Sequence, residues 1–263
     1  MAECIHGFDE GLCDICAPRR SPERVSALAT APRTASRTAS TRAPARTSRT
    51  PGAAASVAPP RLPAFSTRRL YHVTHARNFE SILLDGAIRS VSSGADPDVD
   101  VTAPVVRELR AAADVGDGRA VDGFVPFALS PDSDRWAELR SGAAGAHWSA
   151  AARLSSPTEY VMLVAGASRV GADVVVADAE ASAPATRFTI GDPGRALARI
   201  AQQDPELGAV EVLVPDQVPL DAVLLIGVSN EPMRNRVRRM FDAVDRTPPK
   251  IVVHTPWFAP PEG

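Results

Sequence analysis

One carboxylate in this sequence stands in a setting where a carboxylate is unusual. Glu211 lies within the segment 209–214, AVEVLV, whose apolar and β-branched residues are typical of a buried strand. A carboxylate among such neighbours is exposed on a polar face of the sheet, paired with a cation, or positioned for chemistry. Glu211 is therefore the first candidate for a functional residue.

A second group of polar residues gathers where a predicted strand runs into a predicted helix. In 70–90, LYHVTHARNFESILLDGAIRS, Tyr71, His72, Thr74 and His75 lie at that corner, and Thr74 or Asn78 is expected to cap the helix. The free amide groups of a helix start and the polar side chains beside them can bind an anionic ligand. The alternative interpretation is a satisfied core histidine and an ordinary helix cap.

Two arginines lie one turn apart on another predicted helix. Arg107 and Arg110 belong to 104–113, where Pro104 is suited to the first helical turn. Either they serve an anionic ligand, or they occupy a solvated helix face.

The three cysteines of the chain lie within its first 16 residues. Cys4, His6, Cys13 and Cys16 form a C-x-H-x6-C-x2-C pattern, whose ligands suit tetrahedral zinc. The odd number of cysteines and a reducing compartment disfavour disulfides. With four protein ligands, such a site has no open position for catalysis. The alternative is a terminus with unremarkable thiols.

Composition divides the chain into three parts: a predicted zinc segment at 1–18, a linker at 19–66 and a folded domain at 67–263. The linker is rich in Ala, Pro, Arg, Ser and Thr, has almost no large apolar side chains and is expected to be disordered. Net charge is −4 for 1–18, +10 for 19–69 and −8 for 70–263. A basic arm on an acidic body is a common layout for nucleic-acid contact, although the arm could equally bind the body or an acidic partner.

The sequence has no apolar run long enough to span a membrane and no signal peptide at Met1–Ala17, so a cytoplasmic protein is expected. Within the domain, strands are predicted at 123–130, 159–165, 173–177, 209–214, 222–228 and 250–254. Helices are predicted at 104–113, 132–140, 195–202 and 232–244. Pro126 places its strand at an edge or a bulge, and His147 and Trp148 lie in a loop that the tryptophan is expected to anchor. Short strands mixed with short helices indicate an α+β fold.

Taken in order, these motifs resemble the DarT family of NAD-dependent ADP-ribosyltransferases, toxins that modify DNA bases. The resemblance rests on 70–90, the helix carrying Arg107 and Arg110, DGFVPFALS at 122–130, the segment GAVEVLVPDQVPLDAVLLIGVSNE and the closing HTPWF. It covers about residues 69–258. It implies an ADP-ribosyltransferase-like fold, in which two small packed sheets form a cleft for NAD.

The resemblance also implies roles for the candidate residues. Glu211 and Arg110 match the catalytic pair of the family, with Arg107 as the alternative arginine. The NAD-binding residues would be Tyr71, His72, Thr74, His75 and Arg107. When nicotinamide leaves, the ribose carbon becomes positively charged, and a carboxylate can stabilise that charge without a metal.

The resemblance also implies an acceptor and a partner. A base in single-stranded DNA is the expected acceptor, and a paired antitoxin or ADP-ribosyl hydrolase is the expected partner. The family usually has Gln two residues before the glutamate, where this chain has Ala209. RNA, protein or a small molecule is therefore an alternative acceptor. A non-catalytic module that binds NAD or nucleic acid is the alternative from a different class.

Overall fold

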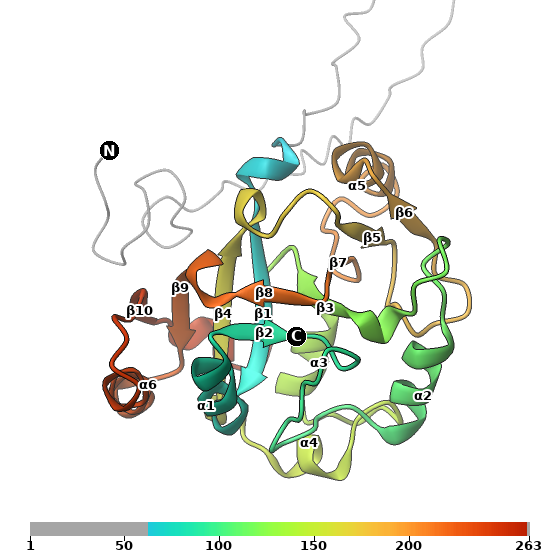
Figure 1. Ribbon diagram of the computed structural model, residues 1–263. Coiled ribbons are helices and arrows are strands. Elements are labelled where there is room, and N and C mark those ends of the chain that lie inside the picture. The colour runs from blue at the N-terminus through green and yellow to red at the C-terminus, as the bar shows by residue number, and fades with distance from the viewer. Residues whose placement is uncertain (1–62, 262–263) are drawn as a thin grey trace, which may run out of the picture. The chain divides into compact units, whose positions relative to one another are not determined.

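The structure is a computed structural model that describes residues 63–261 (Figure 1). The predicted zinc segment, with Cys4, His6, Cys13 and Cys16, and nearly all of the predicted linker lie outside the described residues. Between residues 63 and 261, no helix is both long enough and apolar enough to cross a membrane.

The described part of the chain alternates short helices and short strands. Its helices are α1 (Ala76–Asp85), α2 (Pro104–Ala112), α3 (Asp134–Arg140), α4 (Ala150–Leu154), α5 (Pro193–Ile200) and α6 (Glu231–Ala243). Its strands are β1 (Arg69–His75), β2 (Ala87–Arg89), β3 (Phe124–Ala128), β4 (Tyr160–Gly166), β5 (Val175–Ala177), β6 (Phe188–Ile190), β7 (Glu211–Pro215), β8 (Gln217–Pro219), β9 (Val223–Val228) and β10 (Lys250–Val253). This confirms the α+β fold class.

Eight of these strands follow one another in the order β10-β9-β4-β1-β3-β7-β5-β6, and β2 pairs with β8 in a separate small sheet. The order divides into two halves. β1 pairs with β4 over seven positions and β3 with β7 over five, whereas β1 and β3 share only the pair Tyr71 and Ala128. The two sheets that the resemblance implies are thus β10-β9-β4-β1 and β3-β7-β5-β6, which are joined only through the pair Tyr71 and Ala128.

Pro126 lies where the halves separate. It has no N–H to donate to a ladder, so a central strand excludes it unless one side is unpaired. β3 is not an outer strand of the eight, but at Pro126 it is paired with β7 alone, through Leu213. The predicted edge or bulge is therefore wrong: β3 is an inner strand that pairs with β7 without a register shift, and it accommodates Pro126 because β1 does not pair with it at that position.

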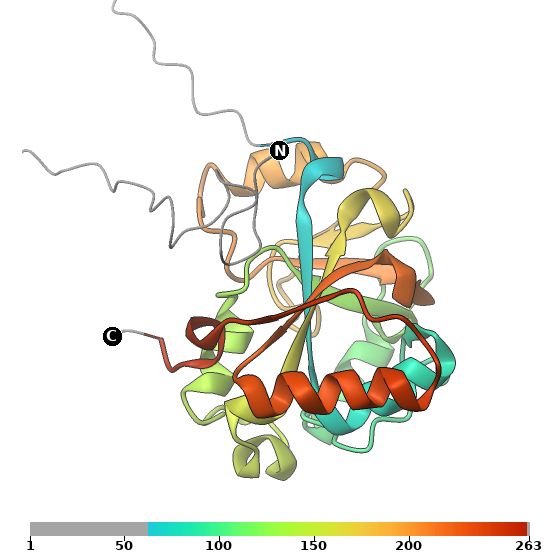
Figure 2. The same cartoon turned by 90° about the vertical axis from the view of Figure 1, so that its left-hand side faces the viewer.

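Helices cover each half of the sheet separately. α6 runs across the β10-β9-β4-β1 half and packs against α1, where the rings of Phe79 and Phe241 lie 5.8 Å apart (Figure 2). α5 lies at the other end, against β5 and β6 (Figure 1). Burial of Phe79, Leu83, Val237 and Phe241 fixes α1 and α6, and with them the end of β1.

Candidate active site

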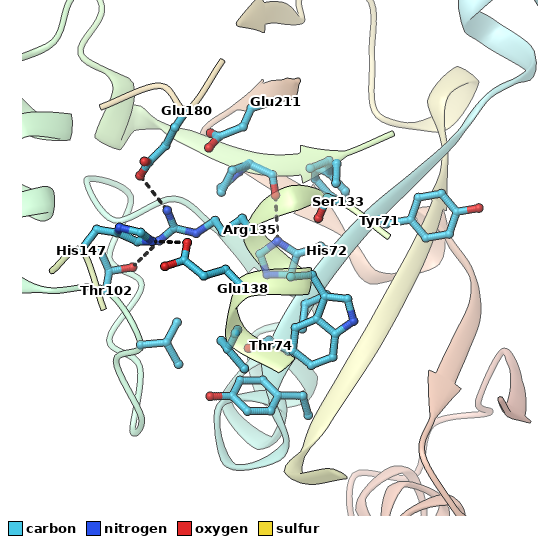
Figure 3. Close-up of a pocket in the computed structure, with 18 of the residues that line it drawn as sticks. Tyr71, His72, Thr74, Thr102, Ser133, Arg135, Glu138, His147, Glu180 and Glu211 are labelled. Carbon is cyan, nitrogen blue, oxygen red and sulfur yellow. Dashed lines mark hydrogen bonds and ion pairs between the residues drawn. The ribbon is translucent and has the colours of Figure 1, made fainter. Parts of the chain in front are cut away.

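A cavity of about 530 Å³ opens beside the point where β1 and β3 separate. This volume is within the range of small-molecule sites. All seven side chains that the sequence indicated for catalysis or NAD binding line it: Tyr71, His72, Thr74, His75, Arg107, Arg110 and Glu211. Figure 3 labels four of them, His72, Thr74 and Tyr71 from β1 and Glu211 from β7, and draws the Tyr71 ring pointing away from the other three. The fold thus brings these seven residues, which are spread between Tyr71 and Glu211 in the sequence, together around one cavity.

Glu211 and Arg110 form an ion pair inside this cavity. Glu211 is the first residue of β7, level with Ala128 on β3 and Ala177 on β5. Arg110 lies in the last turn of α2, and its Nη1 donates to Oε2 of Glu211 over 3.1 Å. Both side chains are largely buried, 13% and 12% exposed. The second amino group of Arg110, Nη2, is buried without a hydrogen-bond partner among the described residues, so it can still donate to a ligand.

Arg107 has a different partner. Its guanidinium pairs with Asp100, and about half of its side chain is exposed. The sequence left open which of the two arginines accompanies Glu211, and the structure places Arg110 there.

His72 is held in one tautomer. Its Nδ1 lies 2.9 Å from the carbonyl oxygen of Pro126 and must therefore carry the hydrogen. Burial lowers the pKa of His72, against a smaller opposing effect of this hydrogen bond, and so favours the neutral ring. Nε2 is then a hydrogen-bond acceptor, suited to a ligand hydroxyl group.

His75, rather than the predicted Thr74 or Asn78, caps α1. Its Nδ1 accepts a hydrogen bond from the backbone N–H of Arg77, and its ring packs edge-on against Tyr160. Asn78 instead bonds both backbone groups of Val99 and ties α1 to the loop that covers the cavity. The sequence Asp85-Gly86 predicts a left-handed stop for this helix, and the structure confirms it, because Gly86 is left-handed at φ 71°.

Thr74 and Tyr71 differ in surroundings. Thr74 is buried at the helix start, whereas the ring of Tyr71 lies edge-on to Trp257, with ring centres 6.0 Å apart. Both belong to the cavity wall.

The sequence indicated Arg135 only as one of several arginines that could offer phosphates a path, and it did not indicate Glu138. Arg135 and Glu138, three residues apart on α3, line the cavity and pair with Glu180 and His147 respectively (Figure 3). Trp148 is buried, which confirms its expected anchoring role, and the guanidinium of Arg135 lies over its ring. The spacing of Arg135 and Glu138 on one helix face was the available signal, but their partners come from distant segments.

Metal ligation finds no support in the described part of the chain. Residues 63–261 contain no cluster of three or more His, Cys, Asp or Glu side chains placed to hold a metal ion.

The chain is similar in fold to solved structures of DarT proteins. A Thermus sp. 2.9 DarT in complex with ADP-ribosylated ssDNA is 21% identical, with a TM-score of 0.61 over 73% of this chain and 96% of that chain. The same protein in complex with NAD+ is 20% identical, with a TM-score of 0.57 over 73% and 97%. A Thermosipho africanus DarTG in complex with ADP-ribose is 16% identical, with a TM-score of 0.56 over 73% and 51%.

The sequence itself matches a family profile. The profile is described as "ssDNA thymidine ADP-ribosyltransferase, DarT" and matches residues 71–259, which include every cavity residue discussed above. A search of curated proteins finds no match. The profile covers well over half of the chain, and the protein is thus a member of the DarT family and an NAD-dependent ADP-ribosyltransferase.

Proposed function

We propose that this protein transfers ADP-ribose from NAD to a base of single-stranded DNA, with Glu211 and Arg110 as its catalytic residues. The observation that carries the proposal is the ion pair of Arg110 and Glu211 in a cavity that also exposes His72. Two elements far apart in sequence supply these groups, and burial of both charges has a cost that a purely structural surface pair would avoid.

The chemistry requires one bond to break and one to form. The bond between the nicotinamide nitrogen and the ribose carbon breaks, and nicotinamide leaves with the bonding electrons. Glu211 stabilises the positive charge that develops on the ribose. A base nitrogen then supplies the electron pair of the new bond and releases its proton to water, and Arg110 stabilises the negative charge that grows on the base.

We assign NAD binding to Tyr71, His72, Thr74, His75 and Arg107, which line the cavity with the catalytic pair. His72 accepts from a ribose hydroxyl group through Nε2. Arg107, half-exposed beside Asp100, is within reach of a charged part of the dinucleotide.

Single-stranded DNA is the acceptor that the family description names, and the Thermus DarT structure contains ADP-ribosylated ssDNA. An unpaired strand suits a cavity of this kind, because its bases can leave the stack at low cost. RNA, protein and small molecules are the alternative acceptors that a direct assay must compare.

The test supplies the full chain with labelled NAD and, separately, single-stranded DNA, duplex DNA, RNA or cell lysate. Label should appear on single-stranded DNA and fall by about 10²- to 10³-fold in Glu211→Gln, a loss typical of one transition-state contact. Glu108→Gln is the matched control, because Glu108 is exposed on α2 and lies outside the cavity lining. Label on RNA or protein alone would replace the acceptor, and absence of NAD consumption would overturn the proposal.

We further propose that the protein acts in the cytoplasm as the toxin of a toxin–antitoxin pair, opposed by an antitoxin or an ADP-ribosyl hydrolase. Modification of DNA bases would stop replication, so uncontrolled activity would be harmful to the cell that makes it. Induced expression of the wild type should arrest growth while Glu211→Gln should not. Equal growth of both strains would argue against the toxin role.

A further inference from the structure

Arg135 is held across the cavity by three segments that are distant in sequence. Its Nη1 donates to Glu180 over 2.7 Å, its Nη2 donates to Thr102 over 3.3 Å, and its guanidinium lies 4.8 Å from the centre of the Trp148 ring (Figure 3 labels Arg135, Glu180 and Thr102). About a third of the side chain is exposed. A cation is thus fixed in position, yet accessible from the cavity.

The charge around Arg135 makes this cation unusual. Carboxylates outnumber arginines among the residues that line the cavity, and the segment 70–263 carries a net charge of −8. NAD has a diphosphate, and a DNA strand has one phosphate per nucleotide. Either ligand needs a local cation to enter such an acidic site.

The arginines of the cavity are not equally able to bind a phosphate. Arg110 is largely buried and paired with Glu211, whereas Arg107 is half-exposed and paired with Asp100. Arg135 is different, because the Trp148 ring keeps its guanidinium in place whichever anion it binds.

The partner of Arg135 can also be released. Glu180 accepts a second hydrogen bond from Oγ of Ser182 over 3.0 Å and is about one third exposed. When a phosphate takes its place beside Arg135, the Glu180 carboxylate keeps the Ser182 contact and gains water. The exchange of carboxylate for phosphate therefore has a low cost.

We propose that Arg135 is a phosphate-binding residue of the active site. Until a substrate binds, the carboxylate of Glu180 occupies the position that the phosphate takes beside Arg135. The ligand is a phosphate ester, supplied by the diphosphate of NAD or by the backbone of single-stranded DNA. The inference rests on the proposed function, since it concerns the same substrates. It names Arg135 as the residue that binds their phosphate and Glu180 as the carboxylate that competes with it.

Two substitutions test it by effects of opposite sign. Arg135→Ala should weaken binding of one substrate about tenfold, the loss expected for one charge-assisted hydrogen bond. Glu180→Gln should strengthen binding of that same substrate by about threefold, since it removes the competing charge. If the ion pair of Arg135 and Glu180 only stabilised the cavity wall, both variants would weaken binding. Effects of the same sign would therefore overturn the proposal.

Binding is measured with the full chain in the Glu211→Gln background, which limits turnover. Calorimetric titration reports the affinity for NAD, and fluorescence anisotropy of a labelled oligonucleotide reports the affinity for single-stranded DNA. If DNA supplies the phosphate, Arg135→Ala should also reduce the slope of log affinity against log salt by about 0.7. If NAD supplies it, only the NAD affinity should change. Unchanged affinity for both substrates would overturn the proposal.

Arg119→Ala is the matched control. Arg119 also lies over an aromatic ring, 4.9 Å from the centre of Phe124, and also pairs with carboxylates, Asp117 and Asp173. It is not among the residues that line the cavity. The control variant should bind both substrates like the parent. A wild type that modifies no DNA would refute the proposed function, whereas DNA modification with unchanged affinities in Arg135→Ala would refute this inference alone.

Discussion

Glu211 and Arg110 depend on each other for their burial. A carboxylate that is only 12% exposed at the start of a strand loses most of its hydration, and the guanidinium of Arg110 compensates for it from α2. The pair also leaves Nη2 of Arg110 buried without a partner among residues 63–261. An unused donor beside a carboxylate is a cost to the folded protein that a ligand would remove.

Removal of Arg110 should therefore affect stability and activity through separable causes. Arg110→Ala leaves Glu211 buried without its cation, and we expect a loss of about 2 kcal/mol in the free energy of unfolding. ADP-ribosyl transfer should fall about 10²- to 10³-fold. Urea unfolding and labelled-NAD assays measure the two effects.

A second substitution, Glu211→Gln in the Arg110→Ala background, distinguishes the cause of the lost stability from the cause of the lost activity. It should recover part of the lost stability, because no unpaired charge is then buried, and none of the activity. Recovery of activity would show that the arginine only neutralises the glutamate.

The two histidines of β1 predict how stability depends on pH. Burial lowers the pKa of His72 and of His75 below the ordinary value of 6.5. Between the lowered pKa and 6.5 the unfolded chain binds more protons than the folded protein, so stability should fall as the pH drops through this window. Urea unfolding at a series of pH values should show the fall in the wild type and a weaker one in His72→Gln. An unchanged pH dependence in the variant would contradict the assignment.

At the scale of elements, the sequence predicted those features that depend only on residues close to one another in the chain. The apolar run of β7, the helix stop at Gly86 and the tryptophan anchor at 148 were all expected from neighbouring residues. The strands β6 and β8 were not, because neither lies in an apolar run like the one that indicated β5. α4 was missed as well, since Ala150–Leu154 is a single short helix started by Ser149.

The partners of the site residues could not be predicted from sequence patterns, because they depend on how distant segments pack together. That Arg110 rather than Arg107 faces Glu211 depends on how α2 packs near β7, 101 residues away along the chain. The tautomer of His72 depends on β3 presenting the carbonyl of Pro126 where the halves of the sheet separate. The cap at His75 replaced the expected Thr74 or Asn78 because Asn78 binds Val99. Tertiary contacts decided each of these.

One element-scale prediction concerns the closing segment Thr255–Phe258. Arg140 on α3 is 5% exposed and donates to the carbonyl oxygens of Pro256, Trp257 and Ala259, while the indole of Trp136 donates to that of Trp257. Arg140→Ala leaves the carbonyl oxygens of Pro256 and Ala259 without this donor, while that of Trp257 keeps the indole of Trp136, and should destabilise the protein by about 3 kcal/mol. Limited proteolysis should then cut near residue 259 faster.

Arg195→Ala, an exposed arginine on α5, is the control for this prediction and should change neither stability nor cleavage. Unaltered proteolysis in Arg140→Ala would mean that other contacts hold the closing segment.

At the scale of the whole molecule, the cysteine segment remains a prediction from its sequence alone. Cys4, His6, Cys13 and Cys16 supply four ligands of the kinds that hold structural zinc. Metal analysis of the purified full chain should find about one zinc per chain, and the double substitution Cys13→Ser and Cys16→Ser should remove it. His147→Ala is the control, because His147 lies in the active-site wall. A full chain free of zinc would contradict the prediction.

The charge distribution of the chain leads to the last prediction. Nine arginines lie between residues 19 and 61, whereas the segment 70–263 carries −8, so electrostatics favours the basic segment as the part that first meets a DNA strand. Replacing these nine arginines with glutamine in the full chain should weaken binding to single-stranded DNA and flatten its dependence on salt, with NAD affinity unchanged. A chain with the order of residues 19–61 shuffled is the matched control and should bind DNA normally, because contacts with phosphates are independent of sequence order. Equal DNA affinity of the wild type and the glutamine variant would instead assign all DNA contact to the folded domain, where Arg135 would be the first residue to test.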